Sequence, residues 1–154
     1  MYVWLIKEET DMSRIILIIS SFFILNTSVN ARELNIENVY QCIMENRILQ
    51  PKYVLAQSCL ETGWLKSYNC MRRNNLFGFR SSIWITDGNK MGYKVFDSWE
   101  ASVEFYKGWQ VWKGYTEGES YIRFLKRVGY AEDPKYGAKV TSVLVILKDK
   151  YGIE

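Results

Sequence analysis

The chain has 154 residues, of which 48% are hydrophobic and 24% charged, and this balance excludes a disordered or fibrous protein. A length of roughly 100 to 200 residues is typical of one domain, so we expect a single core. The formal net charge of +3 favours approach to anionic polymers, whereas the lack of a zinc-finger, helix-turn-helix or long basic motif argues against nucleic acid as a partner.

Residues 1–31 are predicted to lie outside the folded domain. From Met12 onward, a basic residue precedes the apolar run 15–25, and small residues up to Ala31 follow, as in a cleaved signal peptide. Because the run is shorter than the about 20 apolar residues that span a bilayer, we expect export to the periplasm or cell exterior without stable membrane insertion. Residues 1–11 have the wrong charge for a signal peptide, so we interpret them as upstream read-through and Met12 as the start.

The segment 32–154 is predicted to be a single, mostly helical domain with one small β-hairpin. Apolar residues at helical spacing predict a first helix over 35–48, whose apolar face also includes Arg47. A second helix over 51–64 begins at a proline, which the first helical position accepts, and ends near Gly63. It is apolar around most of its circumference, so we expect it to be central.

A loop and a hairpin are predicted to follow the second helix. Residues 67–79 have no helical period and read as a loop. The segments 79–85 and 93–96 are rich in aromatic and β-branched residues, and the pair Asp87-Gly88 between them is a strong turn signal. The sequence therefore predicts a hairpin with its tip at Asp87.

Three further helices complete the predicted domain. Asp97, with Glu100 three residues later, forms a capping-box pattern that predicts the start of a third helix. The next helix is expected over 119–128, and the last one after Pro134.

The chain contains no histidine, which narrows the chemistry available to it. A Ser-His-Asp triad, a Cys-His dyad and any histidine-ligated zinc site are excluded, and we expect neither a metal nor an organic cofactor. Chemistry that depends on a carboxylic acid becomes the leading hypothesis. The three cysteines, Cys42, Cys59 and Cys70, could form one disulfide in an oxidising compartment or remain unpaired, and the sequence leaves both possibilities open.

Glu61 is the best candidate for such an acid. Cleavage of a glycosidic bond commonly requires a carboxylic acid that stays neutral near working pH. Glu61 is the only acid of the second helix, and it lies near Trp64 and, if the following loop folds back, near Phe77. A poorly solvated environment of this kind would raise its pKa. The alternative is that Glu61 is a solvated residue on the helix surface.

Four segments resemble one enzyme family in sequence and order: AQSCLETGW, NNLFGFR, YKVFDSWEASVEFY and VGYAEDPKYGAKV. Together they are similar to the glucosaminidase family, glycoside hydrolase family 73, over about Ile36 to Leu147. The resemblance implies a lysozyme-like helical fold with a small β-lobe, a cleft between the two, and cleavage of the β-1,4 bond after N-acetylglucosamine in peptidoglycan. It also implies that Glu61 is the catalytic acid, whereas Leu65 stands where the family often has glycine.

The second catalytic group is open at the level of sequence. The family typically has another acid on its β-lobe, and the only acid between Glu61 and Asp97 is Asp87, which could activate water or simply form the turn. The 2-acetamido group of the substrate could instead attack the anomeric carbon. Tyr130 matches the cleft tyrosine of the family, where its hydroxyl could hold that acetamido group. Tyr136 could substitute for it, although the helical period favours core packing for Tyr136.

The loop and aromatic residues around the acid are the predicted binding residues. Asparagine amides could hydrogen-bond sugar substituents, a glycine permits close approach, and aromatic rings stack on sugars. The predicted substrate-binding residues are Trp64, Asn74, Asn75, Phe77, Gly78, Trp84, Tyr93 and Tyr136. The basic pair Arg72-Arg73 is predicted to be solvated on the loop, and it could also bind the carboxylates of stem peptides.

The sequence as a whole predicts an exported, monomeric endo-β-N-acetylglucosaminidase whose partner is the glycan strand of peptidoglycan. Three alternatives to this function exist. A wall-binding module that has lost turnover and a muramidase or lytic transglycosylase of the same fold both fit the motifs. Amidase chemistry on the stem peptide is disfavoured, since it usually requires zinc or a cysteine paired with histidine.

Overall fold

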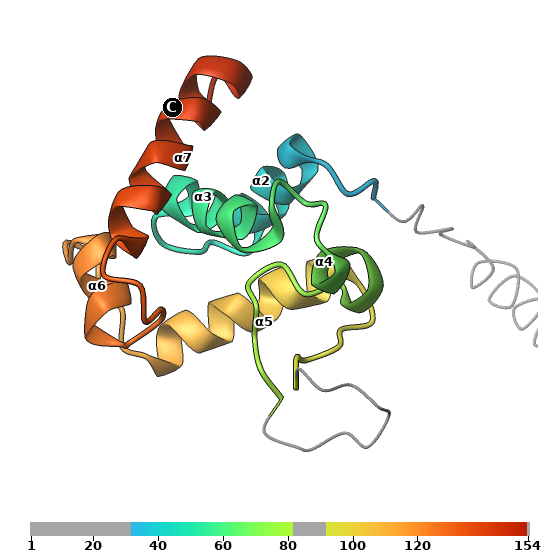
Figure 1. Cartoon of the computed structure of the whole chain (residues 1–154), viewed down its shortest axis with the longest axis horizontal. Coiled ribbons are helices and arrows are strands. Elements are labelled where there is room, and N and C mark those ends of the chain that lie inside the picture. Colours follow the sequence, from blue (N-terminus) through green and yellow to red (C-terminus); the bar gives the residue numbers. More distant parts are fainter. Residues whose placement is uncertain (1–31, 82–91, 154) are drawn as a thin grey trace, which may run out of the picture. The chain divides into compact units, whose positions relative to one another are not determined.

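The structure, a computed structural model, describes residues 32–81 and 92–153, and these residues are mostly helical (Figure 1). The prediction of a mostly helical fold is confirmed. None of the helices in this part of the chain has both the length and the apolar character to span a membrane. The helices, in chain order, are α2 Ile36–Glu45, α3 Pro51–Thr62, α4 Tyr68–Arg73, α5 Trp99–Trp112, α6 Tyr121–Arg127 and α7 Tyr136–Tyr151.

The β-structure of the described residues is limited to one antiparallel bridge between Arg80 and Tyr93. Two backbone hydrogen bonds flank it, from Ser81 N to Gly92 O at 2.6 Å and from Lys94 N to Phe79 O at 2.8 Å. The bridge lies where the two predicted hairpin strands were expected to pair. The predicted tip of the hairpin, with Trp84 and Asp87, and the predicted targeting segment 1–31 lie outside the described residues.

Helix α3 is the central helix of the core, as its sequence predicted. It packs against α2, α4 and α7 (Figure 1). Pro51 occupies its first turn, and Gly63 ends it with a φ of 54°, a left-handed conformation that glycine adopts without steric cost. The helix therefore ends two residues earlier than predicted. Its buried residues are Val54, Leu55, Ala56, Gln57, Ser58, Cys59 and Thr62.

Two other predicted helix boundaries are wrong, in each case because of local capping. The first helix ends at Glu45, and Arg47 adopts a left-handed φ of 52° instead of extending the apolar face. Helix α5 is capped by Ser98, whose hydroxyl accepts a hydrogen bond from Ala101 N at 3.2 Å. The capping box predicted from Asp97 and Glu100 is therefore not the one that the helix uses.

Helix α4 lies inside the segment that was predicted to be a loop. The Ser67 hydroxyl caps its start by accepting from Cys70 N at 3.3 Å, and Asn74 ends it with a φ of 53°. Six residues are too few to show an apolar period, so short helices of this kind are defined by their caps.

The three cysteines are buried, and none of them is in a disulfide. Burial raises the pKa of the Cys59 thiol to about 12 and that of the Cys70 thiol to about 11. Of the two possibilities that the sequence left open, the structure therefore favours the one without a disulfide.

Helices α6 and α7 are in close contact at Gly137, in the first turn of α7. A Cβ atom at this position would lie 2.4 Å from Cγ2 of Ile122 on α6. This is well inside van der Waals contact, and Cγ2 of a β-branched side chain has little freedom to move away. The absence of a side chain at Gly137 therefore permits the observed distance between the two helices.

Replacing Gly137 with alanine is expected to lower the free energy of unfolding by about 1–3 kcal/mol, because the added methyl must push α6 away from α7. Gly108→Ala is the matched control, since Gly108 also lies inside a helix but a Cβ there meets no atom within 4 Å. That change should be neutral or stabilising by up to about 1 kcal/mol. Chemical denaturation measures both, and equal losses of stability would contradict the proposed close contact.

Candidate active site

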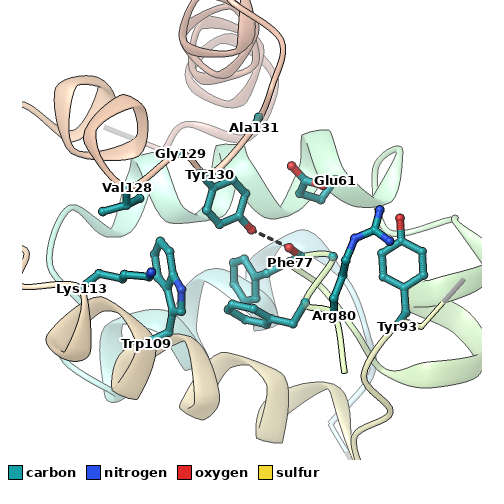
Figure 2. A pocket seen from close by; sticks show the side chains of 12 residues that line it. Glu61, Phe77, Arg80, Tyr93, Trp109, Lys113, Val128, Gly129, Tyr130 and Ala131 are labelled. Carbon is teal, nitrogen blue, oxygen red and sulfur yellow. Dashed lines mark hydrogen bonds between the residues drawn. The ribbon is translucent and has the colours of Figure 1, made fainter. Parts of the chain in front are cut away.

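Glu61 lies on the last turn of α3 and lines a pocket of about 390 Å³ (Figure 2). The end of α3, the loop after α4, the antiparallel bridge, α5 and the loop between α6 and α7 all contribute to its wall. The lining residues are Glu61, Phe77, Gly78, Phe79, Arg80, Tyr93, Trp109, Lys113, Val128, Gly129, Tyr130 and Ala131. The structure thus brings together side chains that are up to 70 positions apart in the sequence.

The Glu61 carboxyl is partly buried, and this environment changes its acidity. Loss of solvation raises its pKa above the ordinary value. The hydroxyl of Tyr136 donates a hydrogen bond to Oε1 at 2.6 Å and acts in the opposite direction, because it stabilises the carboxylate. Burial is the larger effect, so Glu61 holds its proton to a higher pH than an exposed glutamate does.

Gly78 allows the loop after α4 to approach the same carboxyl group. It has a φ of 66°, and a Cβ atom built there would lie 3.1 Å from Oε2 of Glu61. The two oxygens of Glu61 therefore have different surroundings. Oε1 accepts from Tyr136, whereas Oε2 lies beside Gly78, a residue of the pocket wall.

Two tyrosines adjoin the acid, and their positions refine the sequence prediction. Tyr130 lines the pocket, and its hydroxyl donates to the carbonyl of Phe77, which joins the α6–α7 loop to the loop after α4 (Figure 2). Tyr136, for which core packing was favoured, is the tyrosine that donates to Glu61. Burial, reinforced by the negative charge of Glu61, raises the pKa of both phenols. Both are therefore protonated donors at neutral pH.

A buried polar cluster lies one helical turn before Glu61, and sequence reasoning missed it. The Gln57 side chain is fully buried, and its Oε1 accepts hydrogen bonds from Tyr106 at 2.9 Å and from Tyr121 at 2.5 Å. Gln57 also lies near the hydroxyls of Tyr130 and Tyr136, where its amide offsets a small part of the rise in pKa that burial causes in both phenols. The available signal was a glutamine four residues before Glu61, on the same face of an otherwise apolar helix.

The two asparagines of the predicted sugar-binding loop have partners within the chain. Asn74 Nδ2 donates to the carbonyls of Phe96 and Asp97 at 3.0 and 3.2 Å. Asn75 is buried, and its Nδ2 donates to the carbonyls of Phe79 and Lys94 at 2.8 and 2.9 Å. These amides hold the loop next to the bridge and the start of α5. Sugar binding by them stays a prediction.

Some of the other predicted site residues line the pocket, and others do not. Phe77 and Tyr93 line it together with Glu61, whereas Trp64 packs against Tyr151 at a ring distance of 6.5 Å and is not among the lining residues. The guanidinium of Arg73 lies 5.6 Å above the Tyr68 ring, away from the pocket wall.

Three residues of the wall were not predicted as site residues. Arg80, Trp109 and Lys113 all line the pocket. Trp109 and Lys113 lie outside the four family-like segments, whereas Arg80 is the last residue of NNLFGFR but was not predicted to be a site residue. Within residues 32–81 and 92–153, no group of three or more His, Cys, Asp or Glu side chains is placed to hold a metal ion.

Comparisons with known proteins identify the family and the fold. The family model described as mannosyl-glycoprotein endo-beta-N-acetylglucosaminidase matches residues 37–149. The fold is similar to that of the peptidoglycan hydrolase from Sphingomonas sp. A1, with a TM-score of 0.55, 23% identity, and coverage of 70% of this chain and 81% of that one. A structure of a mutant peptidoglycan hydrolase from the same organism gives a TM-score of 0.55, 24% identity, and coverage of 71% and 90%. A search of curated protein sequences found no match.

Replacing Tyr136 with phenylalanine is expected to raise the pKa of Glu61 further, because the hydroxyl that stabilises the carboxylate is lost while the burial remains. NMR titration of the Glu61 carboxyl measures the change. Tyr130→Phe is the matched control, since that hydroxyl donates to a backbone carbonyl instead. A Glu61 pKa that falls in Tyr136→Phe would contradict this assignment.

Glu61→Gln is expected to raise the melting temperature at about pH 7. Because the pKa of Glu61 is higher in the folded chain than in the unfolded chain, ionisation above that pKa destabilises the fold, and glutamine avoids this cost. The difference should shrink as the pH falls to about 3.5, where Glu61 is protonated in both states. Glu104→Gln, at an exposed position on α5, is the control. A glutamine variant less stable than the wild type at neutral pH would refute the argument.

Proposed function

The chain belongs to the glucosaminidase family, and from this we propose that it is a peptidoglycan hydrolase that cleaves the β-1,4 bond after N-acetylglucosamine, with Glu61 as general acid. The observation that carries the proposal is the partly buried Glu61 carboxyl, which has a raised pKa and lies in the wall of a pocket. A general acid for glycoside cleavage needs both properties: a retained proton and access to the substrate.

The different surroundings of the two Glu61 oxygens suggest which of them delivers the proton. Oε1 accepts a hydrogen bond from Tyr136, so a proton on the acid is best placed on Oε2, beside Gly78 at the pocket. That oxygen would donate to the bridging oxygen of the glycan as the bond to the anomeric carbon breaks. Tyr136 acts here as a positioning residue, because it fixes the orientation of the acid.

The second catalytic group is proposed to be the 2-acetamido group of the substrate. Among the described residues of the pocket wall, Glu61 is the only one with a carboxyl group. A mechanism in which the acetamido oxygen attacks the anomeric carbon needs only one strong protein acid. Tyr130 lines the same wall, and its hydroxyl, which donates to the Phe77 carbonyl, is proposed to accept a hydrogen bond from the acetamido N–H. Asp87 remains the alternative partner that the sequence predicted.

The proposal also includes the setting in which the enzyme acts. Export by the predicted signal peptide that begins at Met12 would bring the folded domain to peptidoglycan, and the domain is expected to act as a monomer. Neither a metal nor a cofactor enters the proposed reaction.

Purified protein is expected to solubilise peptidoglycan, and Glu61→Gln is expected to lower the rate by at least about 100-fold, because the proton donor is lost. Turbidity measures the rate, and circular dichroism verifies that the variant is folded. Glu104→Gln should retain full activity, since Glu104 lies on an exposed face of α5.

Analysis of the fragments tests the bond assignment. New reducing ends on N-acetylglucosamine are expected, whereas ends on N-acetylmuramic acid or anhydro ends would replace the assignment with a muramidase or a lytic transglycosylase. Binding without any release of fragments by the wild-type protein would refute an enzymatic function.

A further inference from the structure

The carboxamide of Gln57 is a buried polar group that does not reach the pocket. Its side chain is fully buried on α3, one helical turn before Glu61, and it is not among the lining residues. Its Nε2 atom has no hydrogen-bond partner within the described part of the chain. A buried donor without a partner destabilises the fold, so the presence of an amide at this position needs a reason other than packing.

Two phenols fix the acceptor end of this carboxamide. Oε1 of Gln57 accepts a hydrogen bond from the hydroxyl of Tyr106 on α5 at 2.9 Å and another from that of Tyr121 on α6 at 2.5 Å. Both phenols are buried. Because an amide carries its acceptor and its donor on the same carbon, the two bonds to Oε1 also determine the direction of Nε2.

The donor end of the carboxamide faces the two phenols that adjoin Glu61. Tyr130 and Tyr136 have ring centres 5.8 Å apart, and the amide lies near both hydroxyls. Tyr130 has donated its single proton to the carbonyl of Phe77 (Figure 2). Tyr136 has donated its proton to Oε1 of Glu61 at 2.6 Å. A reversed amide would bring its oxygen against two phenol oxygens without a free proton, so the observed orientation is the favourable one.

We propose that Gln57 is a positioning residue that directs the hydroxyl of Tyr136 toward Glu61 and so determines which oxygen of the acid carries the proton. An N–H dipole beside a phenol oxygen repels the hydroxyl proton, and it polarises the O–H bond so that the phenol becomes a stronger donor. With Oε1 occupied by Tyr136, the proton of Glu61 belongs on Oε2, beside Gly78. This inference rests on the proposed function, because it concerns the acid of that reaction.

The test removes the carboxamide and keeps the length of the side chain. Gln57→Met is compared with Gln110→Met, the matched control. Gln110 is also a buried glutamine, and its carboxamide accepts from the N–H of Leu49 and donates to the carbonyl of Leu49, each at 3.0 Å. Both changes therefore remove a buried amide with two hydrogen bonds, but only Gln57 lies near Tyr136. NMR titration without substrate measures the pKa of Glu61.

Gln57→Met is expected to raise the pKa of Glu61, because the hydroxyl of Tyr136 stabilises the carboxylate less when nothing directs it. Gln110→Met should leave that pKa unchanged. In the Tyr136→Phe background, Gln57→Met should add nothing to the rise, since its effect passes through the hydroxyl that is already absent.

Kinetics with peptidoglycan give a second measurement. The kcat of Gln57→Met is expected to fall about 10-fold, because the acid is no longer held in one orientation. KM should stay within about twofold, since the side chain lies outside the pocket wall. The limb of the pH profile that reports loss of the proton from Glu61 should move to higher pH. A merely structural role would leave this limb in place.

A second variant keeps Gln57 and removes the phenols that orient it. Tyr106→Phe combined with Tyr121→Phe leaves Oε1 without a donor, so the amide can reverse and accept from Tyr136 instead. The pKa of Glu61 is expected to rise again. This variant decides the question if circular dichroism shows that Gln57→Met does not fold.

An unchanged Glu61 pKa in either folded variant, or an equal rise in Gln110→Met, would overturn the positioning role. A further rise of the same size in the Tyr136→Phe background would also overturn it, since Gln57 would then act without that hydroxyl. These titrations require no turnover. An inactive wild-type protein that shows the expected pattern of pKa changes would therefore refute the hydrolase function alone.

Discussion

The hydrogen bond from Tyr136 to Glu61 is the interaction on which the site depends. It joins the first turn of α7 to the last turn of α3, so the environment of the acid is determined by how closely these two helix ends pack. Burial and the tyrosine act in opposite directions on the pKa, and burial dominates. The packing of α7 in turn depends on its neighbour α6, because Gly137 allows Ile122 to come close. The pKa of Glu61 is thus linked to the packing of α6 against α7.

Buried hydrogen bonds also stabilise α3, the helix that carries Glu61. Gln57 lies one turn earlier on the same face and accepts hydrogen bonds from Tyr106 on α5 and Tyr121 on α6. These bonds satisfy the buried amide oxygen, whereas Nε2 of Gln57 is buried without a hydrogen-bond partner among the described residues. The same cluster borders Tyr130 and Tyr136, so the phenols near Glu61 are positioned by three helices and by the loop that carries Tyr130.

The sequence predicted the helical fold and the position of the acid, because these depend on local patterns. Apolar spacing and the Pro51 and Gly63 signals are properties of one segment, and they placed α3 and Glu61 correctly. Helix α4 and the Ser98 cap were missed, since neither has a periodic signal. The partners of a side chain depend on segments far away in the chain. The helical period of α7 therefore indicated core packing for Tyr136 and could not show that its hydroxyl reaches a carboxyl 75 residues earlier.

The buried thiols have a consequence for the export that we propose for this chain. Only the thiolate attacks disulfides, alkylating agents or peroxides, and at neutral pH an apolar environment keeps Cys59 and Cys70 almost entirely in the thiol form. Both thiols of the folded domain are therefore protected against oxidation and mixed-disulfide formation, and this protection would matter in the oxidising compartment to which we propose that the chain is exported. That protection exists only after folding, so under the proposed export rapid folding after translocation would be needed to preserve the reduced side chains.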